Sequence, residues 1–361
     1  MEIPVGAILF FRDLSISIAI YLIVSLSLNL EYGFAGIPNF GKVLSVAGGA
    51  FTAGFLPGRI ATWAFGIELS YVDNNAQVVA EINKSLSQDP LFSISIFVFT
   101  IAIAALVGAV LGFIASYPAI RLREDYLSIT LLAMGEAIQV IGYNYRPIIG
   151  GTLGVQIPNM FLWVEDFGLK SLDVLGSIII CISIIIFIFL ERLVRTPLGR
   201  MLRAVRDSED AAESLGKDVT RIKMKTIIVS SMIGAIAGSL YAFRTVNVIS
   251  STYQRGTWTF WPWVIVVVGG AANNKGVLLG SFAWITTRRI IDFYKSALDP
   301  YLPFNIVWIQ YLLLGVVLIL IQFYRPEGII PEKPTLTINK EKLLRLIENK
   351  KSSEDSDLST P

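Results

Sequence analysis

Residues 174–225 read VLGSIIICISIIIFIFLERLVRTPLGRMLRAVRDSEDAAESLGKDVTRIKMK and join a long apolar run to a basic insert. Residues 177–190 hold no charged side chain, whereas nine Lys or Arg fall between Arg192 and Lys225. A helix of about 20 apolar residues crosses the hydrocarbon core of a bilayer. Loops rich in Lys and Arg stay on the cytoplasmic side. The stretch therefore predicts a membrane span followed by a cytoplasmic loop, residues 192–225.

The whole chain has the composition of a membrane protein. Of its 361 residues, 54% are hydrophobic and only 16% are charged, and the mean hydropathy is +0.63. Soluble domains carry about 25% charged residues, so this chain lacks the polar surface that would cover it in water. The net charge of +2 gives no reason to expect a nucleic-acid partner. Residues 1–13 lack a basic region followed by a cleavage site, so we expect no removable signal peptide.

The chain has no histidine and a single cysteine, Cys181. One cysteine cannot form an intrachain disulfide or a thiolate cluster. The absence of histidine removes the commonest general base and the commonest metal ligand. We therefore expect no catalytic residue, no metal and no cofactor, and a membrane-embedded enzyme is the least favoured class of function.

Nine apolar segments are candidates for membrane spans. They are residues 14–30, 36–56, 91–117, 126–142, 174–191, 224–243, 259–273, 276–293 and 305–324. The glycine-rich segment 36–56 and the short segment 259–273 are the candidates for a broken or re-entrant helix. We expect an all-α polytopic membrane protein, a bundle of about 8–10 transmembrane helices in the plasma membrane. Residues 1–330 form the predicted membrane domain, and residues 331–361 a charged, partly disordered cytoplasmic tail.

Loop charges predict the orientation of the bundle. The acidic loop 57–90 and the loop 143–173, which is poor in Lys and Arg, belong outside. The loop 192–225 and the C-terminal tail belong inside. The side of the N-terminus stays undecided, because it depends on whether residues 36–56 cross the membrane.

Three pairs of glycines, each four residues apart, predict places where two helices approach closely. They are Gly108 and Gly112, Gly234 and Gly238, and Gly276 and Gly280. The alternative is that glycine is simply common in membrane helices. Taken together, the pairs favour a compact helical bundle.

The basic insert predicts helices of its own. Thr196 suits an N-cap followed by Pro197 at the first helical position, and Gly216 suits the end of that helix. Asp218 is expected to cap a second helix that leads into the next span. Between Thr196 and Gly216 an apolar stripe and a basic face recur at helical spacing. The stripe consists of Leu198, Met201, Leu202, Val205, Ala212 and Leu215, and the basic face of Arg200, Arg203 and Arg206. The alternative is a solvated loop whose arginines only determine topology.

Residues 36–43, GIPNFGKV, imitate a phosphate-binding loop. Val43 stands where that loop needs a hydroxyl for Mg²⁺, and no strand pattern precedes the glycines. The segment also lies in an apolar stretch that a nucleotide would not reach. We therefore interpret it as a close-packed turn within the membrane.

Residues 210–216, DAAESLG, resemble the EAA motif of ABC importer permeases, and residues 199–224 resemble the LivM-type permeases of branched-chain amino-acid importers. Further segments that resemble this family, in its order, are residues 32–36, 40–41, 125–136, 150–154, 268–280 and 325–328. The resemblance covers residues 15–330. Two features depart from it: residues 38–42 read PNFGK where the family usually has serine, leucine, glycine and histidine, and the loop 57–90 is long.

The resemblance implies a permease subunit that does no covalent chemistry and moves branched-chain or other small amino acids inward. The implied partners are two cytoplasmic ABC ATPase subunits, a second permease that is LivH-like or identical, an external substrate-binding protein and membrane lipid. ATP hydrolysis in the partners would drive transport through a coupling helix, residues 198–216, whose apolar ridge enters a groove of the ATPase. The implied coupling residues are Arg203, Asp210, Ala211, Ala212 and Gly216.

Four polar residues lie within or beside apolar spans, where a polar group needs a partner or a cavity. They are Asn29, Glu31, Glu136 and Asn144. Each is a candidate for the transport pathway or for helix packing, and for Glu136 we favour an ion pair or hydrogen bond between helices. Two other functions remain open. One is a permease of the same family for urea or short amides, and the other is a secondary transporter or channel that works without ATP.

Overall fold

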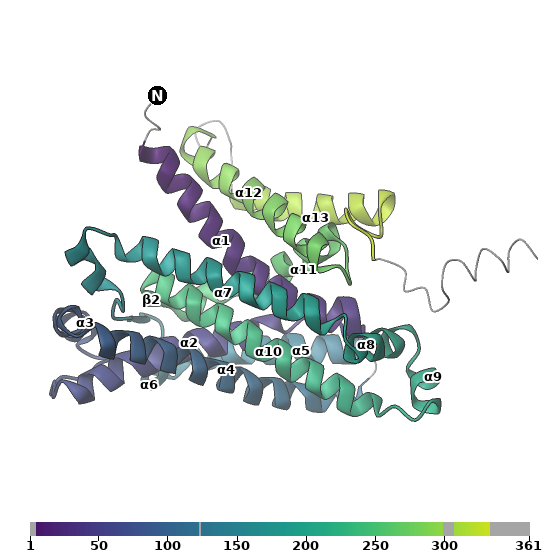
Figure 1. Cartoon of the computed structure of the whole chain (residues 1–361), viewed down its shortest axis with the longest axis horizontal. Helices are drawn as coiled ribbons and strands as arrows, with labels where there is room; N and C mark the ends of the chain where they lie inside the picture. The colour runs from purple at the N-terminus through teal and green to yellow at the C-terminus, as the bar shows by residue number, and fades with distance from the viewer. Residues whose placement is uncertain (1–4, 123, 299–306, 333–361) are drawn as a thin grey trace, which may run out of the picture. The chain divides into compact units, whose positions relative to one another are not determined.

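The computed structural model describes residues 5–122, 124–298 and 307–332, which are almost entirely helical (Figure 1). The longest helices are α1 (Val5–Asn29), α2 (Lys42–Ala64), α4 (Pro90–Arg121), α5 (Glu124–Asn144), α7 (Ser171–Leu193), α10 (Val219–Thr245) and α12 (Asn274–Leu298). The shorter helices are α3 (Asn75–Gln88), α6 (Arg146–Ile149), α8 (Pro197–Asp207), α9 (Glu209–Ser214), α11 (Trp261–Gly269) and α13 (Val307–Tyr324).

Irregular helices and one small sheet complete the fold. The π-helices are η1 (Leu30–Phe34) and η4 (Gly256–Phe260), and the 3₁₀ helices are η2 (Leu162–Phe167) and η3 (Ser250–Thr252). Strands β1 (Val155–Gln156) and β2 (Asn247–Val248) pair antiparallel, with Val155 opposite Val248.

Six of the described helical segments are long and apolar enough to cross a membrane, which confirms the all-α polytopic fold. They are residues 9–34, 42–64, 90–118, 125–144, 171–193 and 219–245. Helix η4–α11 and helix α12 form a pair bent by 119°, which is either a broken seventh span or a re-entrant loop, and α13 is apolar but shorter. The break predicted for residues 259–273 is therefore present. Residues 36–56 differ, because α2 runs unbroken from Lys42 through Pro57 and the irregular backbone precedes it.

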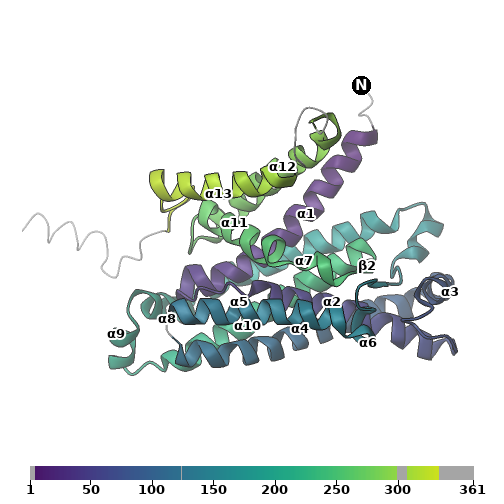
Figure 2. The same cartoon turned by 180° about the vertical axis from the view of Figure 1, so that it is seen from behind.

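Helices α2 and α10 form the centre of the bundle. Helix α10 packs against both α2 and α4, and α5 packs against α2 and α4 in turn (Figure 2). Most residues of α2 and α10 are buried, whereas less than a third of the residues in α4, α5 and α7 are buried. A Cβ built at Gly238 would lie 1.9 Å from the carbonyl oxygen of Val46, and one at Gly108 would lie 2.6 Å from the Cβ of Ala235. The predicted close helix contacts are therefore confirmed.

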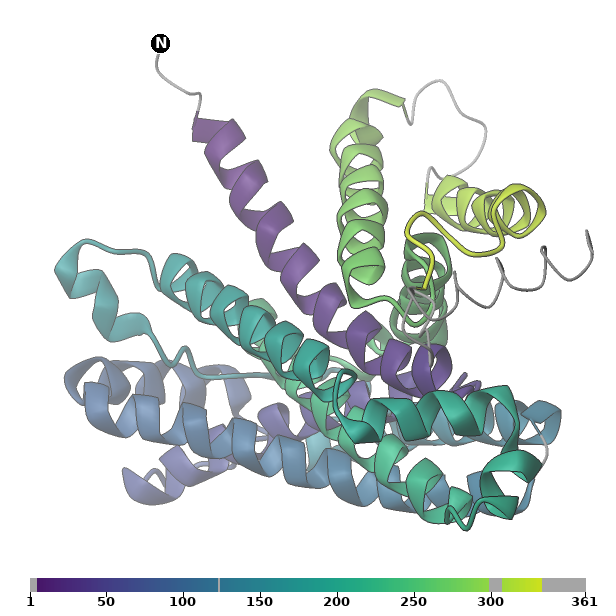
Figure 3. The same cartoon turned by 45° about the vertical axis from the view of Figure 1, so that its right-hand side comes forward.

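Helix α1 links the two ends of the bundle. At its beginning, Arg12 Nη1 lies 2.9 Å from Asp173 Oδ1, at the start of α7. Just beyond its end, the carbonyl oxygen of Gly33 accepts a hydrogen bond from Arg206 of α8 at 2.7 Å. Figure 3 shows α1, in purple, crossing between these two ends. The N-terminal end of α1 therefore lies opposite the 192–225 loop, which the sequence left undecided.

The two loops predicted to be external meet at one end of the bundle. Tyr71 donates a hydrogen bond to the carbonyl oxygen of Gln156 at 2.7 Å, and Arg59 donates one to that of Pro147. Helices α3 and α6 lie at this end, while α8 and α9 lie at the other (Figure 1). This separation agrees with the predicted orientation. The predicted tail, residues 331–361, lies outside the described residues except for its first two.

Candidate functional site

The basic insert folds into two short helices, where the sequence predicted one. Helix α8 ends at Asp207, and Ser208 has extended backbone (φ −164°). The Ser208 hydroxyl accepts a hydrogen bond from the N–H of Ala211 and so caps α9. The single helix expected from Thr196 to Gly216 is therefore wrong, because a capping residue in its middle starts a second helix.

The predicted ends of the insert are largely confirmed. Gly216 follows α9 with φ +73°, a left-handed conformation that glycine adopts without steric cost. Asp218 accepts a hydrogen bond from the N–H of Arg221 at 2.9 Å and caps α10. Thr196 occupies the N-cap position before Pro197, but its hydroxyl donates to the carbonyl of Leu193 and makes no cap bond.

The apolar stripe of the insert mostly faces the protein itself. Leu202 and Val205 are almost fully buried, as is Ala212, and α8 packs against η1 and α10. Leu198 and Met201 are half-buried, and Leu215, with 77% of its surface exposed, is the most accessible residue of the stripe. Part of the predicted ridge is therefore packed within the chain, because an amphipathic helix buries its stripe against the nearest apolar surface. Contact of the rest with an ATPase stays a prediction.

The arginines of α8 do not form one solvent-facing row. Arg200 is exposed, whereas Arg203 and Arg206 are half-buried. Arg203 donates to the carbonyl oxygen of Val194 at 3.3 Å. Arg206 donates to that of Gly33, so it connects the surface helix α8 with η1 inside the bundle.

Three acidic residues of the insert, Glu209, Asp210 and Glu213, lie on α9. Asp210 and Ala211 are exposed there, and Gly216 is exposed just after the helix. Glu209 forms an ion pair with Lys223, which ties α9 to α10. The exposed surface of Arg200, Asp210, Ala211, Leu215 and Gly216 is hereafter called the coupling surface.

A sealed charge cluster lies next to η1. Glu31 and Lys42 are both 0% exposed, and Lys42 Nζ lies 3.5 Å from Glu31 Oε1. Lys42 also donates to the Ser230 hydroxyl at 2.5 Å, and Glu31 Oε2 accepts from the Asn39 amide at 3.0 Å. The cluster therefore joins η1, the start of α2 and α10. Sequence reasoning singled out Glu31 but missed Lys42 as its partner, although a lone lysine in an apolar stretch was the signal.

Asn29 packs helices together. Its amide nitrogen donates to Asn274 Oδ1 at 3.0 Å, and its amide oxygen accepts from the N–H of Ala272 at 2.9 Å. Asn274 in turn donates to Glu191 Oε2 at 3.2 Å. This chain of hydrogen bonds connects α1, the turn between α11 and α12, and the end of α7.

Glu136 and Asn144 lie on α5, away from that cluster. Glu136 Oε1 lies 3.5 Å from Arg255 Nε, which confirms the predicted ion pair between elements. These two side chains are 38% and 53% exposed. The Asn144 amide donates to the carbonyl of Val140 in its own helix, so it holds no second element through that bond.

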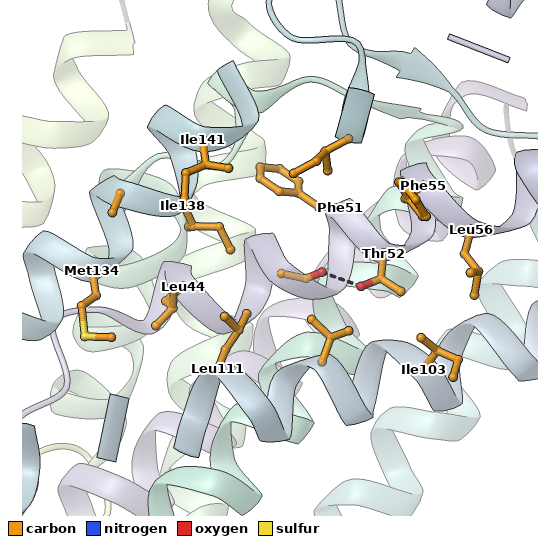
Figure 4. A pocket seen from close by; sticks show the side chains of 14 residues that line it. Leu44, Phe51, Thr52, Phe55, Leu56, Ile103, Leu111, Met134, Ile138 and Ile141 are labelled. Carbon is orange, nitrogen blue, oxygen red and sulfur yellow. Dashed lines mark hydrogen bonds between the residues drawn. The ribbon is translucent and has the colours of Figure 1, made fainter. Parts of the chain in front are cut away.

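A large apolar cavity of about 640 Å³ lies between α2, α4 and α5 (Figure 4). Its lining includes Leu44, Phe51, Phe55, Leu111, Met134 and Ile138. Within the described part of the chain, no charged side chain lines this cavity, and the hydroxyl of Thr52 donates to the carbonyl of Gly48. The cavity can hold hydrocarbon but offers no partner for the charged groups of an amino acid.

Comparison with known proteins assigns the chain to a family. The family described as branched-chain amino acid transport system / permease component matches residues 11–322. The chain belongs to this permease family. It is accordingly a multi-pass protein of the plasma membrane, and the resemblance inferred over residues 15–330 is confirmed.

Several named permeases are similar to the chain. A probable branched-chain amino acid transport permease LivM of Methanocaldococcus jannaschii is 41% identical over 320 residues, which cover 88% of this chain and 92% of the relative. The high-affinity LivM permease of Salmonella typhimurium is 26% identical over 344 residues, 88% of this chain and 69% of the relative. A guanosine permease, NupQ of Bacillus subtilis, is 28% identical over 148 residues, 37% of this chain and 45% of the relative. No solved structure matches the chain.

Proposed function

We propose that this chain is a membrane-spanning subunit of an ABC importer that moves branched-chain amino acids inward. ATP hydrolysis in two cytoplasmic ATPase subunits would drive it, while the chain itself does no covalent chemistry. The observation that carries the proposal is the coupling surface together with the Arg206 hydrogen bond, which ties this surface to the membrane interior at η1.

The contacts around η1 suggest how motion would travel. An ATPase pair that closes on ATP would displace α9 and α8 together. Arg206 would carry this displacement to Gly33, only two residues from the buried Glu31. The Glu31–Lys42 pair and Ser230 then reach α2 and α10, the central helices of the bundle. Packed elements joined by such bonds transmit small shifts because they deform little.

The relatives support the partners that we propose. Methanocaldococcus jannaschii has a LivM relative of this chain. It also has a probable branched-chain amino acid permease LivH, which is 23% identical to this chain over 249 residues. Two different permeases in one organism favour a LivH-like second subunit over an identical one. An external substrate-binding protein would deliver the amino acid at the end that holds α3 and α6.

Cargo is the part of the proposal that needs a direct test, because a guanosine permease is among the relatives. We expect the purified complex in proteoliposomes to take up leucine, isoleucine or valine only when ATP is present on the ATPase side. Uptake of urea or short amides in preference to these amino acids would contradict the proposed cargo. Uptake without ATP would make the chain a secondary transporter.

Partner binding tests the coupling surface. The chain, purified from mildly solubilised membranes, should bring with it ATPase subunits and a second permease. Leu215→Glu should remove the ATPase, because a charge replaces the exposed apolar contact. Leu153→Glu is the matched control, since Leu153 is 80% exposed and lies near β1, at the opposite end of the bundle. Equal ATPase recovery with both variants would contradict the proposed surface.

A further inference from the structure

An ion pair lies deep within a membrane span and is still exposed. Glu136 belongs to the span of residues 125–144 and is eight residues from Asn144, its nearer end. At a rise of about 1.5 Å per residue, this places Glu136 about 12 Å from that end of the helix. Both Glu136 and its partner Arg255 expose more than a third of their side chains. Charged groups at this depth are costly unless water or protein covers them.

The backbone beside this pair is irregular at the same depth. Ser250 donates a hydrogen bond to the carbonyl of Gln139 at 2.7 Å, which holds the segment between β2 and η4 against α5. Ser251, Thr252 and Gln254 of that segment are exposed. Lipid offers no hydrogen bonds, so irregular backbone at membrane depth occurs only where protein buries it or water reaches it. This face of the molecule therefore does not contact hydrocarbon.

The pair itself is loosely held. Its contact joins Arg255 Nε and Glu136 Oε1 at 3.5 Å, longer than the roughly 2.7–2.9 Å of a charge-assisted hydrogen bond. The equally long Glu31–Lys42 contact differs, because Ser230 and Asn39 hydrogen-bond to it. Where water reaches such a pair, a ligand with one positive and one negative group can separate it. The guanidinium then binds the negative group of the ligand, and the carboxylate binds the positive group.

We propose that Glu136 and Arg255 form a binding site for the two charged groups of a zwitterionic amino acid on its way through the membrane. Arg255 would bind the carboxylate and Glu136 the ammonium group, since each finds its complementary charge there. Tyr253, two residues before Arg255, packs edge-on against Phe51 of the apolar cavity, with 5.9 Å between the ring centroids. That apolar neighbourhood suits the aliphatic side chain of such a ligand. The site rests on the proposed transport function and adds its point of contact with the cargo.

Cysteine labelling tests whether water reaches this face. Because Cys181 is the only cysteine of the chain, Cys181→Ser provides a cysteine-free background. We expect Gln254→Cys, in the assembled complex in opened membrane vesicles, to react with a membrane-impermeant cationic thiosulfonate, and leucine to slow that reaction several-fold. Ile184→Cys is the control, because Ile184 is exposed in the middle of α7. Equal reactivity of the two cysteines, or labelling of Gln254→Cys that leucine leaves unchanged, would overturn the site.

Ligand analogues test the two charges separately. The analogue 4-methylpentanoate keeps the leucine carboxylate but lacks the ammonium group, and 3-methylbutylamine has the ammonium group but lacks the carboxylate. Arg255→Gln should raise the KM for leucine about tenfold or more and abolish competition by the acid. Glu136→Gln should abolish competition by the amine. Both variants should still co-purify with the ATPase.

The control for these variants is Arg221→Gln. It breaks an ion pair with Asp218 (3.3 Å) that is similarly exposed but lies in the basic insert, and it should leave analogue selectivity unchanged. Unchanged KM and selectivity in both Arg255→Gln and Glu136→Gln, with leucine transported normally, would overturn the site alone. Failure of these variants to co-purify with the ATPase would also overturn the site, since it would show that the ion pair maintains the structure of the complex. A wild-type complex that transports no amino acid would overturn the proposed function and the site together.

Discussion

The Glu31–Lys42 and Glu136–Arg255 pairs of this permease each have a carboxylate–cation separation of 3.5 Å. Glu31 and Lys42 are completely buried and are held by Ser230 and Asn39. Glu136 and Arg255 are half-exposed, and their neighbouring backbone is irregular. The distance between the charges is therefore a poor guide to what a pair does. The two pairs differ instead in their burial and in the additional hydrogen bonds that they receive.

The difference assigns the two pairs different tasks. A buried pair must recover its lost hydration through contacts within the protein, so it joins the elements that supply those contacts. The Glu31–Lys42 pair does this for η1, α2 and α10. A half-exposed pair keeps part of its hydration and can release its partner at little cost. That property suits contact with a charged ligand.

The largest effect should come from Lys42→Met, which leaves Glu31 as an uncompensated buried charge. Removing one member of a buried pair costs about 3–5 kcal/mol, so we expect a strong fall in the thermal stability of the purified protein and in its amount in membranes. The double variant Glu31→Leu with Lys42→Met should recover most of the loss, because no buried charge remains. A double variant that is as unstable as Lys42→Met would contradict charge compensation as the role of the pair.

A smaller effect is expected from Ser230→Ala, which removes one hydrogen bond to the Lys42 ammonium group. Hydrogen bonds to charged groups contribute about 1.5–3 kcal/mol, and thermal unfolding in detergent would measure the loss. Ser281→Ala is the matched control. Ser281 is also buried, but its hydroxyl donates to the carbonyl of Val277 in its own helix. Ser281→Ala should therefore lower the stability less than Ser230→Ala does. Equal losses would show that Ser230 contributes nothing specific to the charge cluster.

The smallest effect on stability should come from Arg255→Gln. An exposed ion pair contributes about 0–1 kcal/mol, so the unfolding temperature should stay close to that of the wild type. The comparison between the pairs would fail if Arg255→Gln destabilised the protein as much as Lys42→Met.

The sequence predicted the elements of this fold better than the contacts between them. Asp218 and Gly216 were placed correctly because capping and left-handed backbone depend on local chemistry. The break at Ser208 had a local signal too, since Glu209 and Asp210 follow the serine as they do in the first turn of a capped helix. The burial of Leu202 and Val205 had no local signal, because it depends on which part of the folded protein packs against the apolar stripe.

The charge clusters show the same limit. A polar residue in an apolar span predicts that a partner exists, as it did for Glu136. It does not say which of several polar residues lies at the same depth. Lys42 is 11 positions from Glu31 and Arg255 is more than 100 positions from Glu136, so only the packed bundle identifies them as partners.

We propose above that the coupling surface transmits the motion driven by ATP hydrolysis to the bundle. Gly216 offers the most direct test of this role. Gly216 and Gly168 have nearly the same left-handed backbone, with φ +73° and +76°, and open space where a Cβ would lie. Valine at either position should therefore cost a similar local strain of about 1–2 kcal/mol.

The measurement is the number of leucine molecules transported per ATP hydrolysed by the complex in proteoliposomes. We predict that Gly216→Val lowers this ratio several-fold while hydrolysis continues and the spans stay inserted, and that Gly168→Val leaves it at the wild-type value. The same ratio in both variants would contradict the account.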